Sequence, residues 1–175
     1  LLQAMQEILQ NCPEAHIKVA GISVLGVNGI KSRIKIPAYG KYLRRLILKN
    51  RLEGKVRVLG NLSAEEMKRE YLSAQIFVCP SAVENSPNSV AEGQLLGVPV
   101  AASRTGGIPD VVKDGVSGLL FEKGNIHELA ACVSRILTDK QLAKELSASE
   151  RETAAKLYNG ENNYQKLIET YQSIE

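Results

Sequence analysis

Two glutamates, Glu84 and Glu92, flank the place where a short apolar run gives way to a polar loop and then to a helix. The apolar run, with its Pro-Ser end, covers residues 76–81. A short strand that leads through a turn into a helix places that turn at the carboxyl end of a parallel sheet, where open α/β folds bind ligands. Carboxylates at this position can accept hydrogen bonds from the hydroxyl groups of a small molecule.

The residues between the two glutamates resemble a helix start that binds phosphate. Ser86 is a good N-cap and Pro87 a good first helical residue, so we expect the backbone amides of Asn88 and Ser89 to point outward without partners. Such amides attract phosphate. With one carboxylate before the helix and one inside it, the segment has the chemistry of a nucleotide-sugar site.

Composition is that of one ordinary intracellular domain. The chain has 175 residues, 44% of them hydrophobic, and a net charge of +3, which gives no reason to expect nucleic acid as the main partner. The three cysteines, Cys12, Cys79 and Cys132, are odd in number and far apart, which favours reduced thiols over a disulfide frame. No apolar run of 18 residues and no signal peptide occurs in the sequence.

Strand and helix patterns alternate along the chain. Strands are expected at residues 17–21, 56–60, 76–79, 98–102 and 119–121, and helices at 1–9, 39–52, 63–73, 87–97 and 125–137, with a loop at 22–36 and a short helix after the Gly106–Asp110 turn. Two polar helices, separated near residue 159, are expected over 139–175. This alternation predicts an α/β fold with a Rossmann-like parallel sheet flanked by helices.

The chain opens inside an amphipathic helix, with no initiator Met and no cap, which we interpret as a fragment of a longer protein. Because a helix precedes every strand, the sheet is expected to lack its opening strand. The predicted organisation is a donor-binding domain over residues 1–140, followed by helices over residues 141–175 that pack on it.

Four motifs in order resemble the C-terminal lobe of family 4 glycosyltransferases. The matching segments are Pro80-Ser81 with Glu84 and Glu92, then 97–100, 106–110, and Gly115 with 118–121. The resemblance covers about residues 1–140, and the order and spacing of the motifs make it specific.

The resemblance implies one half of a GT-B enzyme, in which two Rossmann-like domains face each other across a cleft. It implies a retaining, metal-independent hexosyltransferase that uses a nucleoside-diphosphate sugar and a saccharide or lipid-linked acceptor, in surface-polysaccharide biosynthesis. The protein would then be cytoplasmic, with contact at the inner face of the membrane left open.

The resemblance also assigns roles to residues. Glu92 would bind the ribose hydroxyls, and Glu84 would contact the transferred sugar as a positioning and electrostatic residue rather than a nucleophile. The amides of residues 87–89, after Ser86, would hold the diphosphate. Backbone around Gly60, Asn61 and Leu62 would read the base.

Two departures from the family pattern weaken the expected site. Many members read Glu-Gly-Phe-Gly where this chain has Glu84-Asn85-Ser86-Pro87, and Pro87 removes one amide donor. The basic pair that holds the diphosphate in relatives, an Arg and a Lys, would lie upstream of Leu1 and is absent, as is the acceptor-binding domain. We therefore expect weak donor binding and no transfer by this chain alone.

Several alternatives stay open at this stage. The two glutamates could be solvated, Gly106-Gly107 could be a plain tight turn, and Asp110 could serve only its helix. The basic residues Lys41, Arg44, Arg45 and Lys49 could dock on anionic lipid or form a solvated face, and His16 and His127 have no metal-ligand partners at useful spacing. At the level of function, the rivals are a phosphorylase or epimerase of the same architecture and a non-catalytic Rossmann-like module that binds a nucleotide or a partner protein.

Overall fold

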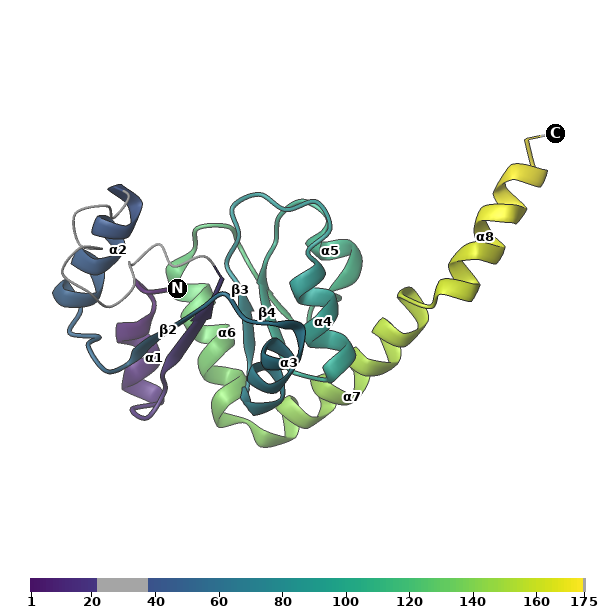
Figure 1. Ribbon diagram of the computed structural model, residues 1–175. Coiled ribbons are helices and arrows are strands. Elements are labelled where there is room, and N and C mark those ends of the chain that lie inside the picture. Colours follow the sequence, from purple (N-terminus) through teal and green to yellow (C-terminus); the bar gives the residue numbers. More distant parts are fainter. Residues whose placement is uncertain (22–37, 175) are drawn as a thin grey trace.

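The computed structural model describes residues 1–21 and 38–174 (Figure 1). The expected loop at 22–36 lies outside them. The elements are α1 (Met5–Asn11), β1 (Ile17–Ala20), α2 (Ala38–Lys49), β2 (Val56–Gly60), α3 (Ala64–Ser73), β3 (Phe77–Cys79), α4 (Asn88–Leu96), β4 (Val100–Ser103), α5 (Ile108–Val111), β5 (Leu119–Phe121), α6 (Ile126–Thr138), α7 (Lys140–Leu157) and α8 (Gly160–Gln172).

Local sequence signals set several helix ends. Ser63 and Glu66 form the expected capping box at the start of α3, in which each side chain binds the other residue's backbone amide. The Asn125 side chain accepts the Glu128 amide at the start of α6. Gly97 ends α4 in the left-handed conformation, with a φ of 69°. These predictions are confirmed.

All five expected strands form, and every pairing between them is parallel. They form two sheets: β1 pairs with β2, and β4 lies between β3 and β5. The alternation of strands and helices therefore gives the expected α/β fold with parallel strands.

Alternate residues of the three-stranded sheet face two separate parts of the core. Ala101, Leu119 and Phe121 pack with α1 and α6, whereas Ala102 and Leu120 pack with α4 and α5. Side chains of a strand alternate between its two faces, so these two groups mark a sheet covered by helices on both sides. Figure 1 shows this layering, with α6 and α4 on opposite faces.

A cavity of about 1100 Å³ separates the two sheets. It is lined by β1 on one side and β3 on the other, with residues of α1 and α3 closing it. In the described part of the chain, β1 and β3 each pair along one edge only, and both free edges belong to this cavity. The expected opening strand would fit at this place, because a strand there could pair with both edges.

The two C-terminal helices differ in their packing. Helix α7 packs against α4 and α6, whereas α8 buries no residue and projects away from the body (Figure 1). The expected packing of C-terminal helices on the domain thus applies to α7, and the boundary at residue 140 stays a prediction. No helix among the described ranges is long and apolar enough to cross a bilayer.

Candidate functional site

The loop that carries Glu84 is held by the end of β4 and the turn that follows it. The Ser103 hydroxyl donates to the Ser81 carbonyl at 2.6 Å, and the Thr105 hydroxyl donates to the Ala82 carbonyl at 3.3 Å. The Ser81 hydroxyl in turn donates to the Glu84 carboxylate at 2.9 Å. The carboxylate therefore has a fixed partner at the carboxyl ends of β3 and β4, where the sequence predicted a site.

The glycines at 106 and 107 pack directly against this loop. A methyl group on Gly106 would overlap the Glu84 carbonyl oxygen, and one on Gly107 would overlap the Asn85 carbonyl oxygen. Gly106 also has a φ of 52°, which favours glycine. Sequence reasoning left a plain turn and a substrate-facing loop equally open; the structure shows a turn whose close approach positions the Glu84 segment.

Helix α4 begins one residue later than expected. Pro87 has an extended ψ of 96° and is the N-cap, and its carbonyl accepts the Val90 amide at 2.9 Å. The predictions of Ser86 as N-cap and Pro87 as first helical residue are therefore wrong. Ser86 lies one position too early for its hydroxyl to cap the helix, and no side chain does so.

The expected amide donors keep their place despite this shift. Asn88 and Ser89 are the first two residues of α4, so their amides cannot have partners inside the helix. Among the described residues, no acceptor binds either amide. The helix start thus presents free donors and the positive end of the helix dipole.

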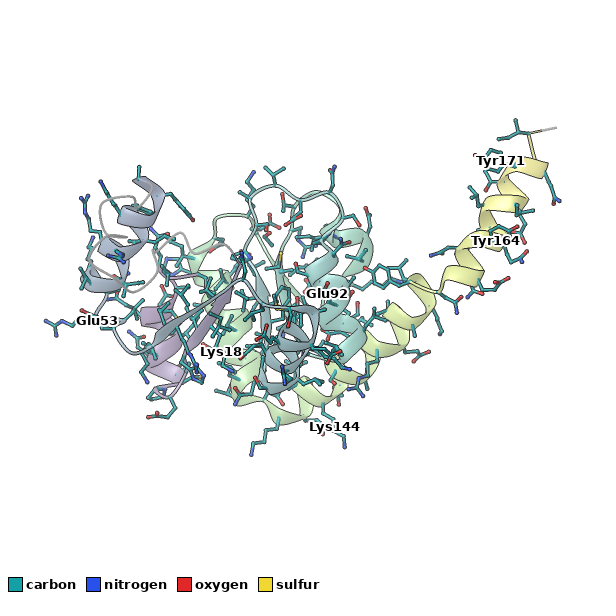
Figure 2. The ribbon with its side chains drawn as sticks, in the orientation of Figure 1. Lys18, Glu53, Glu92, Lys144, Tyr164 and Tyr171 are labelled. Atoms are coloured by element: carbon teal, nitrogen blue, oxygen red, sulfur yellow. The ribbon has the colours of Figure 1, made fainter. Side chains whose placement is uncertain are left out.

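Glu92 lies one turn into α4 and is exposed (Figure 2). Its neighbour is Tyr71 of α3, which is only 6% exposed and whose hydroxyl donates to the Ser89 carbonyl at 3.0 Å. Burial raises the pKa of Tyr71, and the nearby charge of Glu92 raises it further. Tyr71 thus holds the first turn of α4 and lies close to the carboxylate expected to bind ribose.

Sequence reasoning missed Tyr71. The residue belongs to the apolar side of α3, where its ring packs edge-on against Phe77 with centroids 5.3 Å apart. A tyrosine in an amphipathic helix usually indicates core packing. The hydroxyl is the signal that could have distinguished Tyr71 from an ordinary core residue, because a buried tyrosine hydroxyl needs a hydrogen-bond partner.

The residues expected to read the base lie elsewhere in the described structure. Gly60 ends β2 with a φ of 76°, and its carbonyl accepts the Gly21 amide at 2.8 Å. Asn61 is exposed and Leu62 half-buried. No described contact joins these three residues to the Glu84–Ser89 segment, so their role stays a prediction.

Two other charged or titratable side chains have ion-pair partners. Arg104, just after β4, was not singled out from the sequence; it pairs with Asp114 and Glu122 at 3.0 Å each, so two carboxylates balance its charge. His127 pairs with Glu7 at 2.9 Å. The described residues contain no group of three or more His, Cys, Asp or Glu placed to hold a metal, and metal-independent chemistry stays a prediction.

One protein family matches most of the chain. The family model for glycosyl transferases group 1 matches residues 1–153. A D-inositol 3-phosphate glycosyltransferase from Corynebacterium urealyticum is 30% identical over 174 residues, which cover 99% of this chain and 39% of that protein. A sulfoquinovosyl transferase from Arabidopsis thaliana is 32% identical over 100 residues, 55% of this chain and 20% of that protein.

Solved structures share the fold. Anabaena HepE in complex with UDP aligns with a TM-score of 0.82 at 24% identity, over 99% of this chain and 44% of that one. The C-terminal domain of a group 1 glycosyl transferase from Francisella tularensis aligns with a TM-score of 0.65 at 16% identity, over 87% of this chain and 92% of that one. The chain spans less than half the length of the D-inositol 3-phosphate glycosyltransferase and the sulfoquinovosyl transferase. With its family model matched over residues 1–153, the chain belongs to the group 1 glycosyl transferases.

Proposed function

We propose that this chain is the donor-binding part of a retaining glycosyltransferase that moves a hexose from a nucleoside-diphosphate sugar to a saccharide or lipid-linked acceptor, in surface-polysaccharide biosynthesis. The observation that carries the proposal is the start of α4. There, two free amides follow a positioned carboxylate, Glu84, and precede a second carboxylate, Glu92, along the chain. That arrangement offers donors to a diphosphate and acceptors to hydroxyl groups on both sides of it.

The relatives support the donor class. HepE has been solved with UDP and with UDP-glucose, and the alignment with a C-terminal domain over 92% of its length supports the assignment to the donor-binding half. Because this chain spans less than half of its relatives, transfer itself is proposed for the whole enzyme.

The proposed chemistry depends on charge placed before the reaction begins. As the bond between sugar and diphosphate lengthens, negative charge grows on the leaving oxygens, and the Asn88 and Ser89 amides with the α4 dipole stabilise it. Glu84, fixed by the Ser81 hydroxyl, lies beside the sugar that gains positive character. Its role is to position the sugar and stabilise that charge, with no covalent bond to the enzyme.

Donor binding is the first test. The chain is titrated with UDP-, GDP- and ADP-sugars at millimolar concentration and followed by saturation-transfer NMR, for the wild type and for Glu92→Ala, with Glu169→Ala on α8 as an exposed control. Loss of a charge-assisted hydrogen bond should weaken binding about ten- to a hundredfold in Glu92→Ala, and leave Glu169→Ala unchanged. Equal binding by Glu92→Ala and the wild type would remove the ribose role.

Transfer is the second test and separates the two glutamates. In the whole enzyme, Glu84→Gln should keep the donor affinity and lower the rate of transfer, because its carboxylate acts on the transferred sugar. A Glu84→Gln enzyme with a normal rate would show that the fixed carboxylate does not act in the reaction. Binding without transfer by the unsubstituted whole enzyme would favour a non-catalytic nucleotide-binding module.

A further inference from the structure

Positive charge is concentrated in one part of the chain. Residues 15–52 contain nine Lys and Arg and no Asp or Glu, whereas thirteen Lys and Arg against nineteen Asp and Glu remain in the other 137 residues. The modest net charge of +3 is thus the balance of a basic stretch and an acidic remainder. Helix α2 is the part of this stretch that presents a regular surface.

Helix α2 is attached to the body through one face. Leu43 and Leu46 line the cavity between the sheets, and Ile47 packs against the core that α1 and α6 share. Gly40 is the one fully buried residue of this helix. The opposite side carries exposed residues, among them Lys41, Arg45 and Lys49.

The solvent face carries a row of cations. Lys41, Arg45 and Lys49 are all exposed and follow one another at four-residue spacing, which places them in line along one side of a helix. Helix α2 contains no acidic residue, and no described carboxylate forms an ion pair with these three side chains. Like charges at this spacing repel each other, so the row suits a surface that meets a polyanion.

Apolar side chains flank the row on both sides. At 100° per residue, Leu48 lies on one side of the cations and Tyr42 on the other, and they are 62% and 47% exposed. Tyr39, 61% exposed, stacks on Tyr42 with ring centroids 6.2 Å apart, and both rings also line the cavity between the sheets. Cations at headgroup depth beside tyrosine and leucine are the pattern of a helix that lies in a membrane interface.

We propose that the exposed face of α2, formed by Lys41, Arg45 and Lys49 with Tyr42 and Leu48 beside them, docks on an anionic lipid surface. The cations bind lipid phosphates, and Leu48 enters the boundary between headgroups and acyl chains, with Tyr42 at the edge of the contact. The phosphates of a nucleic acid offer the same charge, but an exposed leucine gains nothing from them. This inference rests on α2 and not on the donor site, so the two proposals fail independently.

The test is sedimentation of the 175-residue chain with vesicles of phosphatidylcholine alone or with about 30% phosphatidylglycerol, a fraction that gives the surface a negative potential. The variant Lys41→Gln/Arg45→Gln/Lys49→Gln is compared with a control of equal charge change, Lys123→Gln/Lys144→Gln/Lys166→Gln, whose three lysines are exposed in the turn before α6, on α7 and on α8. Each cation near an anionic surface contributes about fivefold to partitioning, so the α2 variant should lose roughly a hundredfold. The control should bind like the wild type, and circular dichroism checks that all three chains are folded.

A second measurement reports where the helix sits. The chain has no Trp, so Leu48→Trp introduces a single fluorophore on the proposed face, and Val116→Trp provides an exposed control elsewhere. Brominated lipids should quench the indole fluorescence of the Leu48→Trp variant and leave that of the Val116→Trp variant unchanged. The proposal is overturned if the wild type fails to bind anionic vesicles, or if the two charge variants lose equal affinity. It is also overturned if the fluorescence of Leu48→Trp is not quenched, or if the chain binds single-stranded DNA more tightly than the vesicles.

Discussion

Glu150 should make the stability of this protein fall as the pH rises from about 5 to about 8. The side chain lies on α7 with no exposed surface. One carboxyl oxygen accepts the Val100 amide at 2.8 Å, and the other has no partner among the described residues. Burial raises the pKa of Glu150 to about 8, against a lowering by the Val100 amide. The carboxyl is therefore protonated in the folded protein at neutral pH.

The sign follows from the proton count in each state. Below pH 4.5 the carboxyl is protonated in both the folded and the unfolded chain, so it does not make the free energy of unfolding depend on pH. Above that value the unfolded chain releases the proton and the folded chain keeps it, so the unfolded state gains about 1.4 kcal/mol per pH unit until the folded pKa is reached. Between about pH 5 and 7.5 the free energy of unfolding should fall by about 3 kcal/mol from this group alone.

Glu150→Gln tests this directly by urea unfolding at several pH values between about 5 and 7.5. The amide keeps an oxygen for the Val100 donor and cannot ionise, so the variant should gain about 3 kcal/mol over the wild type across that range. Glu152→Gln is the matched control, since Glu152 lies on the same helix but is exposed; its profile should run parallel to that of the wild type. If the Glu150→Gln and wild-type profiles also run parallel to within about 1 kcal/mol, Glu150 is ionised in the folded protein and the reasoning is refuted.

Three further substitutions probe the site and its supports. Tyr71→Phe removes the hydroxyl but not the ring, so it should cost about 1 kcal/mol in urea unfolding and weaken donor binding severalfold through Glu92; unchanged binding would make the tyrosine purely structural. In Gly106→Ala the added methyl group overlaps the Glu84 carbonyl oxygen, so this variant should lose donor binding in the NMR titration. Its control is Gly115→Ala, where φ is also positive but the space around the residue is open. The control should lower the free energy of unfolding by about 1 kcal/mol and leave donor binding intact. Ser63→Ala removes the capping box of α3 and should cost about 1 kcal/mol in urea unfolding; a cost near zero would mean that tertiary packing alone holds the start of that helix.

The elements were predictable wherever a local rule decides the backbone. The Ser63 capping box, the Asn125 cap and the left-handed Gly97 each satisfy helix-end groups within a few residues of sequence, and such groups have few other partners. The start of α4 was missed because Ser86-Pro87 satisfies the same rule locally. The buried Pro87 instead takes an extended conformation, and the helix begins after it.

The contacts that support the site could not be predicted, because they join distant parts of the chain. Nothing near Gly106 in the sequence shows that it lies against the Glu84 carbonyl. Glu150 was expected in a polar helix, yet it is buried against the start of β4, fifty residues earlier in the sequence. Periodicity tells which face of a helix is apolar, but it does not tell what that face covers.

These long-range contacts connect stability to the site through one strand. Glu150 binds the amide of Val100, where β4 begins, and Ser103, where β4 ends, donates to the Ser81 carbonyl in the loop that carries Glu84. Helix α7 also binds the connection before β4, because Ser147 donates to the Gly97 carbonyl at 2.7 Å. Ionisation of Glu150 strengthens its bond to the Val100 amide but leaves a buried charge whose second oxygen has no described partner, so its net effect is to destabilise the packing of α7 against the strand that positions the Glu84 loop. It follows that donor binding should weaken above about pH 8 in the wild type and less so in Glu150→Gln, even though this residue lies at the opposite end of β4 from the site.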